Sequence, residues 1–459
     1  MTERITRRQL VAGGAAAALG ATGFYGLVDR VAGAAPVRPR GRLLPEQHLL
    51  DGLRIVRHEG IEVLVPPLHH EVVTAAVAVG RADLRDARRT LERTLAGFDR
   101  DFEPTPAGLG VTVAWGLPYF RRLVPDAARK HLPHDRRAQK PALLDSPRFP
   151  SDPRTTRLEA NDLAILLRSD RRDHVDEAIE RLRGSGVLRI TSLRRGFAGG
   201  GFDGRRSLPK EMAVAAGIRG AELIPDTAEL FLGFTSTQRG SMGEGRIANF
   251  ETLGFVDLRE SGYFHRGTHL HLSHVTEDLE AWYLNFDFDE RVATTFRPDL
   301  RVDAPAQTVA QGPAEATTEA EVRRAFRSAG RIGHSSSLQT TSRLLADFVG
   351  PDGTHYKWGS AIPIRADFNT LDNPFFFSSR PGEVKPTPVA GVHFLVFNPS
   401  SDDFHRNRLA MDGVLPGGRL PLRPRDRNQG FNSILRTTHR QNFLVPPRRH
   451  RSFPLAELG

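Results

Sequence analysis

The sequence predicts an α+β protein in which one arrangement of strands and helices occurs twice. In the first half, the hydrophobic pattern follows the order strand, helix, strand, strand, helix, strand. A similar but less regular order follows later in the chain. Hydrophobic residues make up 39% and charged residues 26% of the 459 residues, a balance typical of folded proteins with two or three domains.

The first half has the clearer periodicity. Apolar runs such as VVTAAVAV predict buried strands, and the spacing of Leu84, Ala87, Leu91 and Leu95 predicts one face of a helix. The predicted strands are 72–79, 108–114, 162–167 and 187–190, and the predicted helices are 83–95, 118–123 and 173–183. This order, without the short piece at 118–123, is that of a ferredoxin-like domain.

A Gly-rich stretch at 195–209 interrupts this pattern, and a second domain is expected after it. Its predicted strands are 268–275, 391–397 and 441–445, and its predicted helices are 277–283, 314–329 and one that starts within 403–409. Polar, Pro-rich segments at 130–157 and 298–313 are predicted loops. We therefore expect an N-terminal ferredoxin-like domain at 45–195 and a C-terminal one at 196–459.

Composition excludes several classes of site. The chain has no Cys, so disulfides, thiolate metal sites, iron–sulfur clusters and Cys nucleophiles are excluded. Its formal charge is +10, from 64 Lys and Arg against 54 Asp and Glu. Because no single block of Lys and Arg dominates, we do not expect a nucleic-acid partner.

Residues 1–34 differ from the rest of the chain. Arg7-Arg8 precedes an uncharged, Ala- and Gly-rich stretch at 9–28, and Ala32-Gly33-Ala34 has the pattern of a cleavage site. This order predicts a twin-arginine (Tat) signal peptide at 1–34, and hence an exported protein located outside the cell, in the periplasm or at the cell envelope. A retained membrane anchor is the alternative. We expect residues 1–34 to make no contacts needed for folding.

Five segments, taken in order, resemble the dye-decolorizing (DyP-type) haem peroxidase family. They are Gly108–Leu123, Asn161–Leu182, Arg266–Trp282, Gly391–Phe404 and Asn442–Arg448, which closes with NFLVPPR. The resemblance identifies a divergent member and implies two ferredoxin-like halves with a pocket for haem b in the C-terminal half. It also implies peroxidase activity, with hydrogen peroxide and a small-molecule reductant as partners.

The same resemblance nominates the catalytic residues. Gly200-Gly201-Phe202-Asp203-Gly204 is similar to the family's G-x-x-D-G motif, so Asp203 is the candidate distal acid. A carboxylate near bound peroxide can accept a proton from one oxygen and return it to the other. An Asp before Gly is also common in ordinary turns. Arg365, in the stretch 361–368, is the candidate distal Arg, whose guanidinium would stabilise developing negative charge.

His334 is the candidate axial ligand of the haem iron, by similarity to the family's proximal His. The family's Asn-Pro-Arg after that His is absent, and Gln339-Thr340-Thr341-Ser342-Arg343 stands in its place. Arg343 is a candidate for haem binding and a rival of Arg365 for the distal role. The departures leave open a non-catalytic DyP-like haem-binding or haem-carrier protein. A homo-oligomer is also open.

His269, His271 and His274 form a cluster in the sequence, and His269 and His271 share one strand face. No nearby carboxylate completes a facial triad or a zinc-type spacing. We therefore expect packing or contacts with haem propionates there, rather than a separate metal site.

Overall fold

The fold is taken from a computed structural model of the chain. It describes residues 21–58, 61–135, 138–201, 204–234, 262–300, 317–344, 346–349, 355–356, 362–373, 387–423, 426 and 429–458. The predicted α+β class with two ferredoxin-like halves is confirmed, because each half shows that topology in its strand order.

In the N-terminal half, four antiparallel strands pair in the spatial order β9-β3-β8-β4. With two crossing helices this is the ferredoxin-like order, in which the first strand lies between the third and the fourth. The apolar face of α4 buries Leu91 and Leu95, as its spacing predicts. The elements are β3 (His69–Val77), α4 (Leu84–Asp101), β4 (Gly110–Gly116), β8 (Leu163–Ser169), α7 (Arg172–Gly184) and β9 (Leu188–Phe197).

The C-terminal half repeats the plan in the spatial order β18-β10-β15-β14. Among the described residues, three α-helices lie in its first crossover and one lies in its second. The elements are β10 (Thr268–Glu277), α9 (Phe288–Thr295), α10 (Glu319–Ala329), α11 (His334–Ser342), β13 (Ile364–Arg365), β14 (Phe368–Thr370), β15 (Gly391–Asn398), α12 (Ser401–Met411) and β18 (Leu435–Val445).

The two sheets join along both edges. Strand β14 pairs with β9 through Asn369 and Phe197, and β18 pairs with β4 through Phe443 and Leu444. Within the described part of the chain, eight strands thus pair in a closed ring. Apolar side chains from both halves fill the interior of this barrel, among them Val72, Leu166, Leu272, Leu395 and Phe443.

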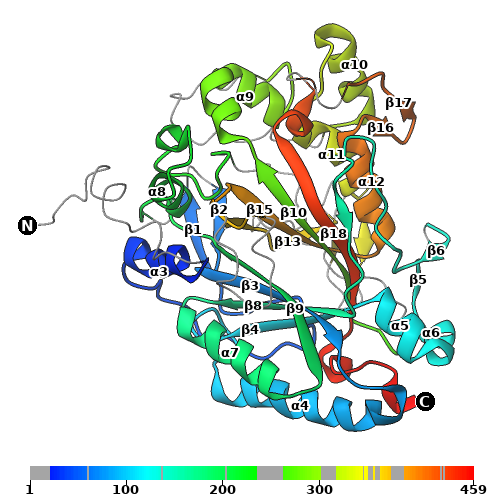
Figure 1. Ribbon diagram of the computed structural model, residues 1–459. Coiled ribbons are helices and arrows are strands. Elements are labelled where there is room, and N and C mark those ends of the chain that lie inside the picture. The colour runs from blue at the N-terminus through cyan, green and yellow to red at the C-terminus, as the bar shows by residue number, and fades with distance from the viewer. Residues whose placement is uncertain are drawn as a thin grey trace, which may run out of the picture.

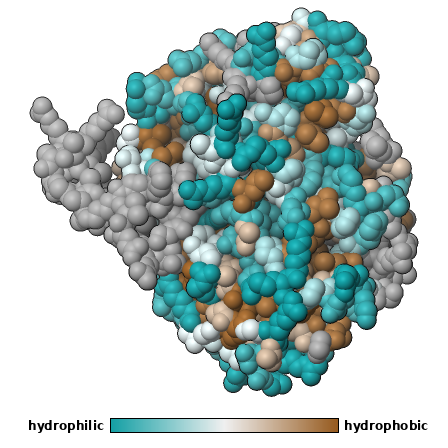
Figure 2. Space-filling model, turned by 45° about the vertical axis from the view of Figure 1, so that its right-hand side comes forward, coloured by the Kyte–Doolittle hydropathy of each residue, from teal (hydrophilic) through white to brown (hydrophobic). Residues whose placement is uncertain are grey.

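Helices cover the outside of the ring. Helices α4 and α7 lie against the N-terminal sheet, and α11 and α12 lie over the C-terminal sheet (Figure 1). On the face shown in Figure 2, hydrophobic residues occur in small groups among hydrophilic ones. Additional helices are α5 (Leu117–Leu123), α6 (Pro125–His131) and α8 (Leu208–Ala215), and paired short strands include β1 (Arg54–His58), β2 (Ile61–Val65), β5 (His134–Asp135), β6 (Lys140–Pro141) and β7 (Arg157–Leu158).

Several predicted elements differ from those observed. Strand β18 starts at Leu435, earlier than the predicted 441, and the predicted helix at 277–283 is a short π-helical segment, Ala281–Asn285, preceded by the end of β10. The predicted loop at 130–157 contains the short strands β5 and β6. Most of the predicted loop at 298–313 lies outside the described residues. The division into domains 45–195 and 196–459 stays a prediction, and β9 runs through it to Phe197.

Helix α3 (Ala21–Ala32) packs against the body beside α8 and β9 (Figure 1). Tyr25 and Val28 are buried in a cluster that includes Phe197 and Met212. The Tyr25 hydroxyl donates to Asp372 Oδ1 at 2.7 Å and accepts from the Leu371 backbone N–H at 3.2 Å. The helix is therefore part of the hydrophobic core and of a buried polar network.

The sequence predicts that residues 1–34 make no contacts needed for folding, and the structure shows that α3 does contact the body. The physical reason is the buried carboxyl of Asp372. Burial raises the pKa of Asp372 to about 6, while hydrogen bonds from Tyr25 and from the Arg195 backbone N–H act to lower it. Among the described residues, no helix is both long enough and apolar enough to cross a bilayer.

Deleting residues 1–34 should lower the melting temperature by several degrees, because it removes α3 from the core. Deleting residues 1–20 should leave the melting temperature unchanged, since α3 is kept. The milder variant Y25F, which removes only the hydroxyl, should cost about 1–3 kcal/mol because Asp372 loses a buried donor. Calorimetry and chemical denaturation measure these effects. Equal melting of both truncated proteins would contradict the packing of α3.

Candidate functional site

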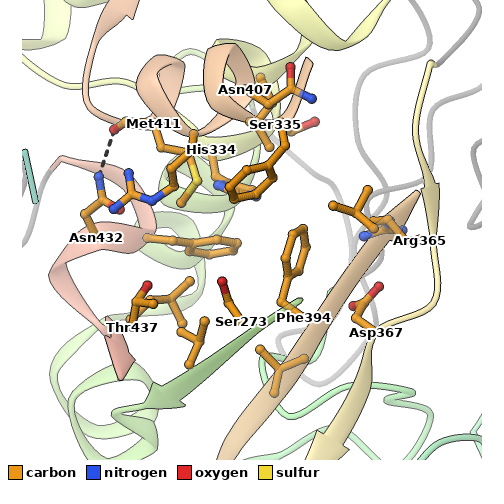
Figure 3. A pocket seen from close by; sticks show the side chains of 18 of the residues that line it. Ser273, His334, Ser335, Arg365, Asp367, Phe394, Asn407, Met411, Asn432 and Thr437 are labelled. Atoms are coloured by element: carbon orange, nitrogen blue, oxygen red, sulfur yellow. Dashed lines mark hydrogen bonds between the residues drawn. The ribbon is translucent and has the colours of Figure 1, made fainter. Parts of the chain in front are cut away.

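One cavity lies between the C-terminal sheet and its covering helices. The space that centres of water molecules can reach in it is about 220 Å³, far more than the roughly 10–15 Å³ that one water needs. Helices α11 and α12 line one side, and alternate residues of β10 and β15 line the other (Figure 3). The cavity is therefore large enough for an organic ligand, and it lies in the C-terminal half as the sequence predicts.

Strand alternation decides which residues of the sheet reach this cavity. On β15, Val392, Phe394 and Val396 line it. The residues between them belong to the opposite face, where Leu395 and Phe397 pack in the barrel interior. His393 shares that face and lies 3.2 Å from Asp372 Oδ2 through its Nε2 atom. His393 therefore faces away from the cavity.

His334, the candidate axial ligand, is the first residue of α11 and lines the cavity. Gly333 precedes it, and a Cβ atom at position 333 would lie 2.0 Å from the backbone oxygen of Phe296. This close approach fixes where the helix begins. The imidazole packs on Phe431, with ring centroids 4.4 Å apart, and Figure 3 shows it on the helix side of the space.

Burial, with the positive charges of Arg365 and Arg408, lowers the pKa of His334 to about 3. The ring is therefore neutral at ordinary pH, as a metal ligand must be. Its Nδ1 atom is buried and has no hydrogen-bond partner among the described residues. Ligating His residues usually donate from the second nitrogen to a carboxylate or carbonyl. In the described part of the chain, His334 departs from that arrangement.

Arg365 and Arg343 line the same cavity from two other elements. Arg365 ends β13, where it pairs with Val396 of β15. Arg343 is buried at the C-terminal end of α11. Three of the four predicted site residues thus converge on one space, although they come from separate segments.

Asp203, the fourth, lies outside the described residues. The glycines before it are described, and Gly200 and Gly201 have φ angles of +80° and +78°. A Cβ atom at either position would lie within 2.2 Å of a backbone oxygen, that of Arg206 or of Thr227. The run therefore requires glycine on both steric and conformational grounds. The role of Asp203 stays a prediction.

Two more guanidinium groups form the wall beneath α12. Arg440 Nη2 donates to Asp152 Oδ1 at 3.0 Å, and Arg408 Nη2 lies 3.4 Å from the same oxygen. Arg408 Nη1 also lies 3.0 Å from Asp412 Oδ1. All four side chains are at least nine-tenths buried. This ion-pair network gives the wall a fixed, charge-balanced structure.

Two of the three clustered His residues, His271 and His274, have defined packing positions. His271 stacks on Phe404 of α12 with ring centroids 3.3 Å apart, and its Nδ1 lies 2.7 Å from Asn442 Oδ1. His274 shares the barrel face of Leu272. Among the described residues, no group of three or more His, Asp or Glu could hold a metal ion.

Comparison with known sequences places the chain in a family. Residues 67–447 match the family described as "Family of unknown function (DUF7405)". The chain belongs to this family. No curated protein matches the sequence.

Solved structures with a related arrangement include three dye-decolorizing proteins. DyPB from Rhodococcus jostii RHA1 has 14% identity and a TM-score of 0.47, with 85% of this chain and 96% of that chain covered. The dye-decolorizing protein from V. cholerae has 14% identity and a TM-score of 0.47, with 85% of this chain and 97% of that chain covered. A dye-decolorizing peroxidase from Bacteroides thetaiotaomicron has 11% identity and a TM-score of 0.45, with 84% of this chain and 95% of that chain covered. Similarities this low do not identify the reaction of a DUF7405 chain.

The sequence reasoning missed three carboxyl groups of the cavity, Asp152, Asp367 and Glu277. Asp367 lies two residues after Arg365 and so reaches the same side of the space (Figure 3). Glu277 ends β10 on the same face as Ser273 and Val275, which also line the cavity. The alternation along 273–277 was the available signal for Glu277, but this residue was assigned to the start of a helix.

Breaking the Asp152 network should destabilise the protein strongly. D152N leaves Arg440 buried without its anion, which typically costs about 3–5 kcal/mol of unfolding free energy. D145N is the matched control, because Asp145 forms an exposed ion pair with Arg121 and should cost no more than about 1 kcal/mol. Chemical denaturation measures both. An equal, small effect of the two substitutions would show that the wall does not depend on this pair.

Proposed function

We propose that this chain is an exported, haem b-dependent peroxidase of DyP type. The observation that carries the proposal is the convergence of His334, Arg343 and Arg365 on one cavity of the C-terminal half. The sequence resemblance nominates these residues independently of their position in space. Residues chosen for one shared function are expected to meet at one site, and these three do.

The residues of the cavity suit a haem group. The ring of His334 lines the cavity and is neutral, as a metal ligand must be. Phe394, Phe404 and Phe431 offer apolar surface for a porphyrin. Guanidinium groups such as that of Arg343 match the carboxylate geometry of propionates. Bound haem would supply the redox chemistry with peroxide.

The chain itself would contribute binding, charge stabilisation and proton transfer. His334 would hold the iron from the helix side. Arg365, on the strand side, would bind the peroxide oxygen and stabilise negative charge as it develops. Asp203 would accept a proton from peroxide and return it. The ion pairs of Asp152 would keep the wall of the cavity rigid.

The proposal also includes partners and location. Arg7-Arg8 and the apolar stretch after them support recognition by the Tat export machinery, and a location in the periplasm, at the cell envelope or outside the cell. Hydrogen peroxide and a small-molecule reductant are the proposed substrates. The charge distribution favours no nucleic-acid partner.

A DyP-like haem-binding or haem-carrier protein without catalysis is the second candidate. One observation favours it: in the described part of the chain, no carboxylate or carbonyl accepts a hydrogen bond from Nδ1 of His334. Such a partner raises the basicity of a ligating His. A weak axial ligand would suit reversible haem binding better than turnover.

Replacing the proposed ligand should abolish tight haem binding. H334A removes the imidazole, so haem-loaded protein should lose the absorption spectrum of His-ligated haem. H405A is the control: His405 lies on α12 and is partly buried, but it does not line the cavity. Titration of each purified protein with haem, followed by visible absorption, measures the effect. An unchanged spectrum in H334A would assign the ligand to another residue.

Replacing the proposed distal groups should slow the reaction with peroxide while haem stays bound. R365L should lower the rate about 10²–10³-fold, as loss of one well-placed donor does. D203N keeps the size of the side chain but removes its base, and should also slow this step. R419L, at an exposed position of β17 (Gly418–Arg419), is the control.

Stopped-flow absorption after mixing with peroxide measures these rates. Wild-type rates in R365L and D203N would contradict the distal assignment. A wild-type protein that binds haem but does not react with peroxide would favour the carrier.

A further inference from the structure

The cavity contains one carboxyl group whose environment differs from that of its neighbours. Glu277 is the last residue of β10 and lines the cavity on the same face as Ser273 and Val275. Its backbone is fixed, because its N–H donates to Ala390 O at 2.9 Å. Its Oε2 atom is buried and has no hydrogen-bond partner among the described residues. This atom is therefore available to a molecule bound in the cavity.

Glu277 differs from Asp152, another carboxyl group of the cavity, in having no positively charged partner within the described residues. Asp152 lines the same cavity, but Arg440 and Arg408 balance its charge at contact distance. Glu277 forms no ion pair with any Lys, Arg or His of the described chain within 4.0 Å. A buried carboxylate without a cation is costly, so such a group tends to keep its proton.

Burial and one charged neighbour act on Glu277 in the same direction. That neighbour is Asp367; the pKa of the Tyr283 phenol is raised mainly by burial and also by Glu277. The strands that flank it contribute apolar residues, Val392 from β15 and Leu435 from β18. Burial, with the negative charge of Asp367, raises the pKa of Glu277 to about 8.

We propose that Glu277 is a second acid of this cavity, which donates its carboxyl proton to an anionic ligand bound there. The inference deepens the proposed function and rests on it for the identity of the ligand, a peroxide or another small anion. In this step the carboxyl O–H bond breaks and a bond forms between the proton and the ligand. The resulting carboxylate recovers a proton from water, and no electron is transferred.

The first test uses the protein without haem. Infrared difference spectra should show the C=O band of a protonated carboxyl near neutral pH, and this band should disappear as pH rises through about 8. E277Q should lack the band, and D367N should move its loss to lower pH because the neighbouring negative charge is gone. E280Q is the control, since Glu280 is exposed and pairs with Arg219.

Stability gives a second readout on the same protein. Between the usual glutamic acid pKa of about 4.3 and about 8, the folded carboxyl keeps a proton that the unfolded one releases. Stability therefore decreases as pH rises through this range and levels off above it. E277Q should lose this part of the pH dependence and be more stable than wild type at pH 9. A wild-type protein with no band and no such difference would overturn the assignment.

The decisive test uses haem-loaded protein with fluoride as the probe anion. If the protonated carboxyl donates a hydrogen bond to the anion, fluoride affinity should fall about fivefold between pH 8 and 9, and E277Q should lose this dependence while E280Q keeps it. Equal pH profiles of wild type and E277Q would overturn the proton donation but leave the haem proposal intact. Failure to bind haem at all would instead reject the proposed function, and the infrared and stability results would still decide whether Glu277 holds a proton.

Discussion

Closure of the barrel depends on two narrow seams, and a glycine lies at each of them. At one seam, a Cβ atom at Gly196 would lie 2.2 Å from the backbone oxygen of Asn369. At the other, a Cβ atom at Gly116 would lie 2.7 Å from the side-chain Nε2 of Gln441 on β18. Few residue pairs hold each seam, so the backbones must approach closely for the ring to close.

This closure determines the two faces of the C-terminal sheet. Because the inner face is sealed against the N-terminal sheet, only the outer face is available to α11 and α12. Alternation along β10 then sends Ser273, Val275 and Glu277 outward, while Leu272 packs inside. The cavity therefore follows from closure of the ring, because its floor is the outer face of the C-terminal sheet, which does not pack inside the barrel.

The sequence predicts the long, regular elements well, because burial of one face produces a readable period. Strand β3 and helix α4 are examples. Strand β14 has three residues, too few to show any period, although it forms one seam. Helix α11 is also hard to find, because the buried side chains of HSSSLQTTS are mostly polar and no apolar stripe marks it.

In the candidate site, too, some residues could be predicted from the sequence and others could not. A resemblance of motifs predicted His334, Arg343 and Arg365, which meet although the chain separates them. Alternation along 273–277 could place Glu277 on the cavity face, but no local pattern could predict its raised pKa, which depends on burial and on Asp367 from a distant segment. Helix α3 was missed for a different reason: the apolar residues of an export signal and those of a docked helix look alike in a sequence.

Helix α3 overlaps the apolar stretch at 9–28, so the residues of this overlap can lie either in the protein core or in a membrane, but not in both. The uncharged stretch at 9–28 is long enough for a bilayer only as a whole, but Tyr25 and Val28 from it are buried in the protein. With α3 on the body, residues 9–20 would span about 18 Å as a helix, against a hydrocarbon core of about 30 Å. Insertion of the whole stretch in a membrane therefore requires α3 to leave the body. Asp372 then loses both the hydrogen bond from the Tyr25 phenol and the cover that α3 provides, so insertion would open this buried polar network.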